Sequence, residues 1–131
     1  MNFKVWFESE ESIMGININD SEQPFTIQIL NGQKTIETRN SPTLHPYVGK
    51  KVGLIRTGVG KATLVGYAVV GKPKFYNNKK EFDKDYRKHL VSPKSSFYIS
   101  EKGKWGYPLE NVVKIPETEI KSKGIVARKL T

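Results

Sequence analysis

Cysteine is absent from this 131-residue chain, and histidine occurs only twice, as His45 and His89. The first absence excludes disulfide bonds, a thiol nucleophile and thiolate metal ligands. Neither histidine has neighbouring carboxylates at metal-ligand spacing, so we predict no metal site and no cofactor. No serine–histidine–acid arrangement can be argued from these positions either.

Long apolar runs are also missing. No stretch approaches the length that would span a membrane, and the first residues, Met1 to Glu8, lack the apolar core of a signal peptide. These absences predict a soluble, cytoplasmic protein with no membrane partner.

Acidic residues are scarce relative to basic ones. Thirteen Asp and Glu residues stand against 22 Lys and Arg residues, which gives a formal net charge of +9. A balance this basic favours polyanionic partners, because lysine and arginine contact phosphates and release their counterions. The alternative is that the charge serves solubility alone.

The aromatic residues supply enough bulk for a hydrophobic core. Six Phe, six Tyr and two Trp accompany a hydrophobic fraction of 37%, and a chain of this length can bury a core as one domain. We find no internal repeat and no linker. The sequence therefore predicts a single domain over residues 1–131.

The local patterns are mostly those of short strands. Alternating or β-rich runs predict strands at Phe3–Phe7, Ile13–Ile18, Lys51–Arg56, Ala62–Val70, Phe97–Ser100, Trp105–Ile115 (interrupted by Pro108) and Gly124–Leu130. Loops are expected at Glu8–Glu11, Ser41–Gly49 and Gly71–Asn78, and a bulge or close approach at Gly66. Together with the helices discussed next, this pattern predicts an α+β fold, a small barrel.

The clearest helical pattern covers Lys79 to Leu90 and ends before Pro93. Phe82, Tyr86 and Leu90 are spaced to share one face.

The segment from Asp20 to Gly32 fits two structures. Alternating Phe25, Ile27 and Ile29 before Asn31-Gly32 indicate a hairpin. Asp20 or Ser21 as a cap, Pro24 near the start and Gly32 at the end indicate a helix instead. The residues alone leave both open.

The chain is organised around residues 31–39, which bring together a turn, a lysine, a carboxylate and an arginine. In an extended segment Thr35, Glu37 and Arg39 would lie on one face, with Lys34 at its entry and Ile36 and Thr38 on the other face. Lys34 and Arg39 are suited to a phosphate or a base edge. Glu37 could hold Arg39, contact an exocyclic amine or act as a general base. The alternative is an ion pair that only ties the loop down.

Further candidates are aromatic or basic. Tyr76 stands among lysines and could stack an unstacked base; the alternative is that Phe75 packs inward and the lysines are solvated. Trp105 and Tyr107 could line a cleft or fill the core. Arg56 flanks a glycine-rich turn that could approach a nucleic-acid backbone closely.

Two separated motifs resemble one known family. Gln23-Pro24-Phe25 followed by residues 30–39 is similar to the signature of the ASCH (activating signal cointegrator homology) domain, part of the PUA-like superfamily. The family hallmark is Gly-x-Lys-x-x-Glu-x-Arg, whose four positions are filled by Gly32, Lys34, Glu37 and Arg39. Residues 105–112 resemble its closing strand and residues 123–125 the tail that follows, so the resemblance spans roughly residues 13 to 130.

The resemblance implies a β-barrel of five or six strands flanked by two to three helices, with a cleft beside the signature loop. It favours the helix in the ambiguous segment, because the family has a helix before the signature. ASCH domains are regarded as RNA-binding modules, and some small members are amidohydrolases of acylated cytidine. Those enzymes carry a threonine three positions after the lysine. Here Lys34 matches the lysine but Glu37 occupies the threonine position, so the hydroxyl nucleophile is missing.

We therefore predict that RNA or a nucleotide-like ligand binds in a cleft formed by the signature loop. Lys34 and Arg39 would hold its anionic part, Glu37 would orient Arg39 or contact a base, and amides near Gly32 would complete the site. The alternative is a hydrolase, an acylated nucleoside amidohydrolase or ribonuclease, that uses Lys34 and Glu37 as catalytic residues with a lowered Lys34 pKa. The ligand and the oligomeric state stay open.

Overall fold

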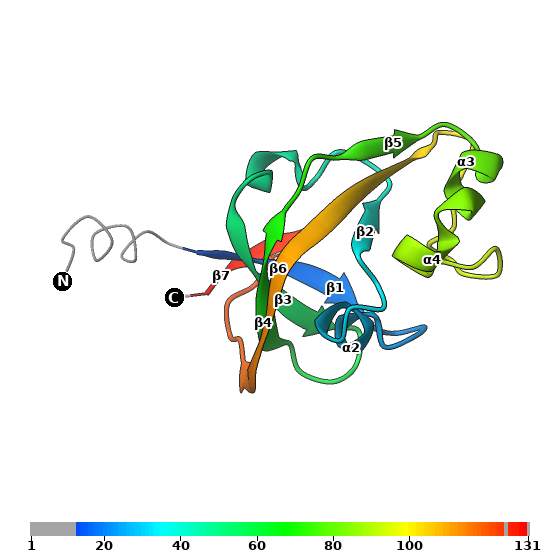
Figure 1. Cartoon of the computed structure of the whole chain (residues 1–131). Helices are drawn as coiled ribbons and strands as arrows, with labels where there is room; N and C mark the ends of the chain where they lie inside the picture. The colour runs from blue at the N-terminus through cyan, green and yellow to red at the C-terminus, as the bar shows by residue number, and fades with distance from the viewer. Residues whose placement is uncertain (1–12, 125, 131) are drawn as a thin grey trace.

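The computed structural model describes residues 13–124 and 126–130, and in this part of the chain the strands form one curled, mixed sheet (Figure 1). The sheet order is β2-β6-β4-β3-β1-β7, and β5 also pairs with β6. The strands are β1 (Met14–Asn19), β2 (Ile36–Arg39), β3 (Lys51–Thr57), β4 (Thr63–Val70), β5 (Lys74–Tyr76), β6 (Lys104–Glu119) and β7 (Ala127–Lys129). The helices are α2 (Phe25–Leu30), α3 (Lys79–Lys84), α4 (Tyr86–His89) and a 3-10 turn, η1 (His45–Tyr47).

This arrangement is a small α+β barrel, as predicted. The strand predicted at Phe3–Phe7 and the loop at Glu8–Glu11 lie outside the described residues. Within the described residues, no helix is long and apolar enough to cross a membrane.

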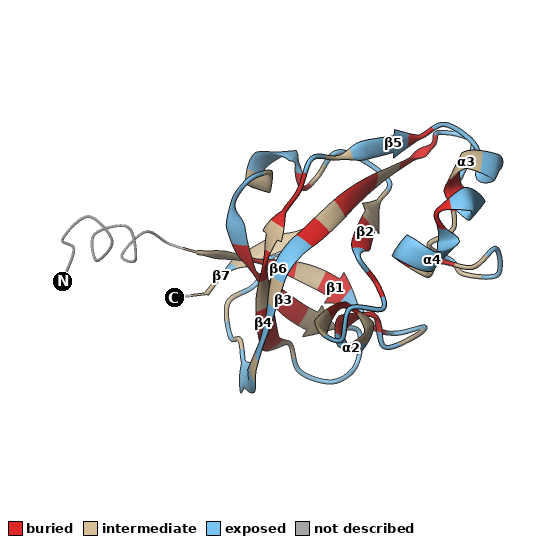
Figure 2. Cartoon of the chain, in the orientation of Figure 1, coloured by how far each residue is buried: buried red, intermediate tan, exposed pale blue. Residues whose placement is uncertain are grey.

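The hydrophobic core lies inside the curl of the sheet. Buried positions, red in Figure 2, recur along β1, β3, β4 and β6 where these strands face one another across the curl. The same cluster continues under α2 and the α3–α4 segment. Its fully buried members include Ile16, Ile18, Ile29, Leu44, Val52, Leu54, Val70, Tyr76, Phe82 and Tyr107.

The strands predicted at Lys51–Arg56 and Ala62–Val70 are confirmed and pair as the β3–β4 hairpin, and the irregularity predicted at Gly66 is confirmed as well. Leu54 is opposite Gly66 but Ile55 is opposite Leu64, so Val65 is an extra residue in β4. A Cβ atom added to Gly66 would lie 2.4 Å from the carbonyl oxygen of Val113 on β6. Glycine is therefore required here because the neighbouring backbone approaches too closely for a side chain.

The ambiguous segment is a helix, α2. Its first turn is capped from a distance by the buried carboxylate of Asp20, which accepts hydrogen bonds from the Thr26 backbone N–H (3.0 Å) and hydroxyl (2.5 Å). This satisfies one of the donors that a helix start leaves free. Phe25 and Ile29 then face the core. Tertiary burial of this face decides against the hairpin.

The helix predicted at Lys79–Leu90 is broken into α3 and α4. Asp85 stands at the break, where its carboxylate accepts hydrogen bonds from the hydroxyl of Tyr76 (2.7 Å) and from Lys74 (3.0 Å). Because the helix axis changes here, Tyr86 is 43% exposed and does not share the buried face of Phe82. The chain leaves α4 at Leu90, which adopts a left-handed conformation (φ 59°).

Near the C-terminal half, the strand predicted at Phe97–Ser100 was wrong, and the strand predicted at Trp105–Ile115 is confirmed but without the predicted interruption at Pro108. The segment Phe97–Ser100 is a series of turns, in which serine hydroxyls accept hydrogen bonds from backbone N–H groups two residues ahead, as Ser95 does from Phe97. Pro108 does not interrupt the strand around it, since β6 runs continuously from Lys104 to Glu119. Proline is accommodated because β6 changes partner there: Val70 of β4 pairs with Leu109, whereas Lys74 of β5 pairs with Gly106.

Candidate ligand-binding site

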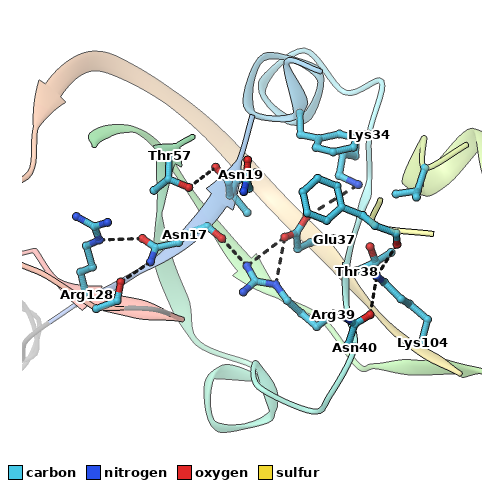
Figure 3. Close-up of a pocket in the computed structure, with 15 residues that line it drawn as sticks. Asn17, Asn19, Lys34, Glu37, Thr38, Arg39, Asn40, Thr57, Lys104 and Arg128 are labelled. Atoms are coloured by element: carbon cyan, nitrogen blue, oxygen red, sulfur yellow. Dashed lines mark hydrogen bonds and ion pairs between the residues drawn. The ribbon is translucent and has the colours of Figure 1, made fainter. Parts of the chain in front are cut away.

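The barrel is not closed by hydrogen bonds between β1 and β2. We call this gap the seam. On one side β2 is the last strand of the sheet and pairs only with β6, and on the other side β7 covers β1 only as far as Ile16. A pocket of about 360 Å³ opens at the seam (Figure 3). It is lined by Asn17, Ile18, Asn19, Phe25, Lys34, Glu37, Thr38, Arg39, Asn40, Thr57, Val91, Phe97, Lys104, Gly124 and Arg128.

Lys34 enters this pocket from the turn between α2 and β2. Its side chain is buried, and its Nζ lies 2.5 Å from the His89 carbonyl oxygen, 3.9 Å from Glu37 Oε1 and 4.4 Å from the centre of the Phe25 ring. Burial lowers the pKa of Lys34 from 10.5 to about 8, against the opposing effect of Glu37. Lys34 therefore changes charge near the top of the physiological pH range.

Glu37 and Arg39 form an ion pair on β2 that also bridges the seam. Arg39 donates from Nε (3.2 Å) and Nη2 (3.1 Å) to Glu37 Oε2, and Nη2 also donates to the backbone carbonyl of Asn17 on β1 (2.6 Å). A single guanidinium thus replaces the missing strand pairing at this point. Figure 3 shows the dashed contacts from Glu37 and from Asn17 converging on the Arg39 guanidinium.

Lys104, at the start of β6, is a second buried lysine of the pocket that sequence reasoning missed. Its Nζ donates to the side-chain oxygen of Asn40 (2.8 Å) and the carbonyl oxygen of Phe97 (2.5 Å). Burial lowers its pKa from 10.5 to about 8, with Glu37 opposing the shift. In the sequence Lys104 resembles any other lysine in a turn. Its burial becomes apparent only in the structure, where it begins strand β6 and contacts the Phe97 carbonyl oxygen.

The charges of the pocket lining do not balance. Among the described residues, four cationic side chains contribute to the lining, Lys34, Arg39, Lys104 and Arg128, but Glu37 is the only carboxylate. The lining also includes four apolar side chains, Ile18, Phe25, Val91 and Phe97. Among the residues that the structure describes, no three histidine or carboxylate side chains are grouped to hold a metal ion. The arrangement is suited to an anion that carries a planar apolar group.

Three of the predicted site residues, Lys34, Glu37 and Arg39, come together in this pocket. Two other predicted residues lie outside it. Gly32 is exposed in the turn after α2, where its φ of 84° suits glycine, and it does not line the pocket. Arg56 on β3 pairs with Asp20 (3.3 Å) and Glu117 (3.7 Å).

The predicted aromatic residues also lie outside the pocket lining. Tyr76 is fully buried, with its hydroxyl on Asp85 and its pKa raised by burial, so the interpretation that it stacks a base is wrong. Phe75, which the alternative placed inward, is 37% exposed. Tyr107 is fully buried with its hydroxyl oxygen 2.6 Å from His45 Nδ1, and Trp105 packs between His45 and Phe75.

Comparison with known proteins identifies the fold. No family model matches the chain, and no curated protein does. Among solved structures, the ASCH protein from Zymomonas mobilis superposes with a TM-score of 0.66 at 16% identity, covering 82% of this chain and 73% of that one. A tyrosine-to-phenylalanine mutant of that protein gives 0.67 at 15% identity (84% and 77% covered), and a serine-to-alanine mutant 0.65 at 16% (81% and 72%).

The chain is therefore a small α+β barrel. More specifically, it has the fold of an ASCH domain, as its sequence motifs predicted. An identity of 15–16% establishes the fold alone, so the function of the seam pocket has to be argued from this chain's own residues.

Proposed function

We propose that this protein binds RNA or a nucleotide-like ligand, with one nucleotide unit in the seam pocket. One observation carries the proposal: two buried lysines, Lys34 and Lys104, share a pocket in which Glu37 is the single carboxylate among the residues that the structure describes. Burying a charge without a counter-charge is costly, and the lowered pKa of each lysine reflects that cost. A phosphate would supply the missing negative charge.

The other side of the pocket favours a nucleotide over a bare anion. The partly exposed ring of Phe97 offers aromatic surface to a base, and the buried ring of Phe25 packs beside it, with ring centres 6.2 Å apart and planes tilted by 60°. The volume lies in the range of small-molecule sites. In this arrangement Lys34 and Lys104 hold the phosphate and Arg39 keeps Glu37 in place. The net charge of +9 adds a nonspecific, salt-sensitive attraction for RNA.

The test compares Lys104→Met with Lys102→Met in a salt titration of binding to a single-stranded RNA hexamer. Both variants remove one positive charge, but Lys102 is exposed and lies outside the pocket, so it is the matched control. Near 0.15 M salt we expect Lys104→Met to lose at least about tenfold in affinity and Lys102→Met about twofold or less. Equal losses that vanish with rising salt would mean that only overall charge attracts RNA. Thermal unfolding checks that both variants are folded.

A hydrolase is the second candidate, and the lowered pKa of Lys34 is the observation that favours it. A lysine with a pKa of about 8, 3.9 Å from Glu37, can act as a general base at mildly alkaline pH. Activity would then rise as the pH passes 8 and disappear in Lys34→Met. Suitable substrates for the assay are acylated cytidine and an RNA hexamer. Complete recovery of both after prolonged incubation would leave binding as the function.

A further inference from the structure

The main chain of β2 turns a free edge toward the pocket. In an antiparallel pair, alternate residues direct both their N–H and C=O groups at the partner strand. The bond from the Leu109 N–H to the Thr35 carbonyl (2.8 Å) makes Thr35 one of the residues directed at β6. Glu37 and Arg39 lie two and four residues further along β2, opposite Tyr107 and Trp105, so their N–H and C=O groups also point at β6. The N–H and C=O of Thr38 therefore point away from β6, toward the pocket that Thr38 lines.

The strand across the seam shows the same feature. The Asn17 N–H donates to Val126 (3.0 Å) and the Asn17 carbonyl accepts from Arg39, so Asn17 faces outward from β3. Two residues later, the main chain of Asn19 also faces outward, beyond the end of β7. In the described part of the chain, the N–H and C=O of Thr38 and of Asn19 make no main-chain hydrogen bond outside the strand ladders, and both groups face away from those ladders. Two unpaired strand edges thus border one pocket.

These groups have the chemistry of a base-reading element. The N–H and C=O of one extended residue lie side by side and offer one donor and one acceptor. The hydrogen-bonding edge of a nucleobase likewise carries a donor beside an acceptor, and proteins that bind single-stranded RNA hydrogen-bond such edges. A continuous peptide strand fits less well, because the hydrogen bond from Arg39 to Asn17 crosses the seam.

We propose that the N–H and C=O of Thr38 read the hydrogen-bonding edge of a base in the seam pocket, with the Asn19 main chain facing it from β1. This inference rests on the proposed function, in which the lysines hold the phosphate of the same nucleotide. It adds that main-chain atoms recognise the base. A sequence motif, which describes side chains, cannot predict such a contact.

The test uses a substitution that removes one main-chain donor. Proline at Thr38 deletes the N–H that faces the pocket and keeps both ladder bonds of the neighbouring residues, since proline is tolerated on the free side of an edge strand. Thr38→Val is the matched control, because it removes the hydroxyl but keeps the N–H. The probes are the four nucleoside 5′-monophosphates and ribose 5-phosphate, which carries the same sugar and phosphate without a base.

The measured quantity is the affinity for each monophosphate divided by the affinity for ribose 5-phosphate. We expect Thr38→Pro to lower this ratio by about fivefold for the preferred base, the effect of one lost hydrogen bond, and Thr38→Val to leave it unchanged. An unchanged ratio in Thr38→Pro overturns the inference. So does wild-type protein that binds ribose 5-phosphate as tightly as every nucleotide. An RNA hexamer of the preferred base, measured in parallel, shows whether the pocket serves a free nucleotide or a nucleotide within RNA.

Failure of the proposed function gives a different result. In that case wild-type protein binds neither the monophosphates nor the hexamer beyond the level of the Lys104→Met variant. Should Thr38→Pro fail to fold, amide NMR of the wild type decides. The N–H resonances of Thr38 and Asn19 should shift when a nucleotide is added and should not shift with ribose 5-phosphate. If neither ligand shifts these resonances, the inference is wrong.

Discussion

Because two lysines are buried in the pocket, we predict that this protein becomes more stable against unfolding as the pH rises above 7. Lys34 and Lys104 each have a pKa of about 8 in the folded protein, against 10.5 ordinarily. The unfolded chain therefore holds the two protons more tightly than the folded one between pH 8 and 10.5. Stability rises with pH wherever the unfolded state binds more protons, so unfolding should become harder across this window.

The size of the effect follows from the same two pKa values. For one lysine, the linkage relation gives an increase of about 2 kcal/mol in the free energy of unfolding between pH 7 and 9.5. Because the two lysines repel each other and share Glu37, the combined gain should be less than twice that amount. Above pH 10 the buried tyrosines oppose the trend, since burial raises the pKa of Tyr76 and of Tyr107.

The assay is urea unfolding at pH 7, 8 and 9.5 on wild type, Lys104→Met and Lys102→Met. Wild type and Lys102→Met should gain stability over this range, and Lys104→Met should lose about half of that gain. A wild-type stability that is flat or falls from pH 7 to 9.5 would refute the reasoning. It would mean that the lysines are solvated or neutralised by a group other than Glu37.

Four further predictions follow from single contacts. Affinity for a nucleoside monophosphate should fall by about thirtyfold per contacting lysine between pH 7 and 9.5, because the phosphate keeps its charge while the lysines lose theirs; calorimetry at the two pH values measures this. Gly66→Ala should cost at least about 2 kcal/mol in urea unfolding, since its Cβ would meet the Val113 carbonyl oxygen, and a loss below 0.5 kcal/mol would contradict that contact. Tyr76→Phe removes the buried hydroxyl on Asp85 and should cost about 1–2 kcal/mol, measured by thermal unfolding with the exposed Tyr86→Phe as the control. Arg39→Lys should cost about 1–3 kcal/mol, because one ammonium cannot serve both Glu37 and the Asn17 carbonyl; wild-type stability in this variant would show that the seam needs no bridge.

Local pattern was enough to predict the parts of the fold that depend on neighbours in sequence. The β3–β4 hairpin and the bulge at Gly66 follow from β-rich runs around glycines. Helix α2 needed a further argument, because its alternating residues also suit a strand. Its cap, Asp20, is six residues from the Thr26 atoms that it binds.

The predictions that failed, such as the continuous helix at Lys79–Leu90 and the interruption at Pro108, have a different cause. In each case the structure depends on contacts with other segments of the chain. The break at Asp85 is stabilised by Tyr76 and Lys74 of β5, and neither partner is apparent in a helical periodicity. Pro108 is tolerated in β6 only because the neighbouring strand changes there.

The signature motif predicted three of the fifteen residues that line the pocket. Lys34, Glu37 and Arg39 are close in sequence and could be grouped by pattern. Lys104 and Asn40, which are 64 residues apart, could not. The aromatic predictions failed for a related reason, because whether a tyrosine on a strand faces solvent or core depends on register, which alternation alone leaves open.

The unpaired edges and the uncompensated lysines have one structural origin, the failure of β1 and β2 to pair. Pairing would give Thr38 and Asn19 hydrogen-bond partners and would remove the pocket in which Lys34 and Lys104 lie. The open seam instead leaves main-chain polar groups unpaired and two buried lysines beside one shared carboxylate, Glu37, and in the described part of the chain Arg39 bridges the two strands. A ligand with a phosphate and a base edge would satisfy both sets of groups at once. The structural cost of the seam and its proposed selectivity for nucleotides are therefore two consequences of the same missing strand pair.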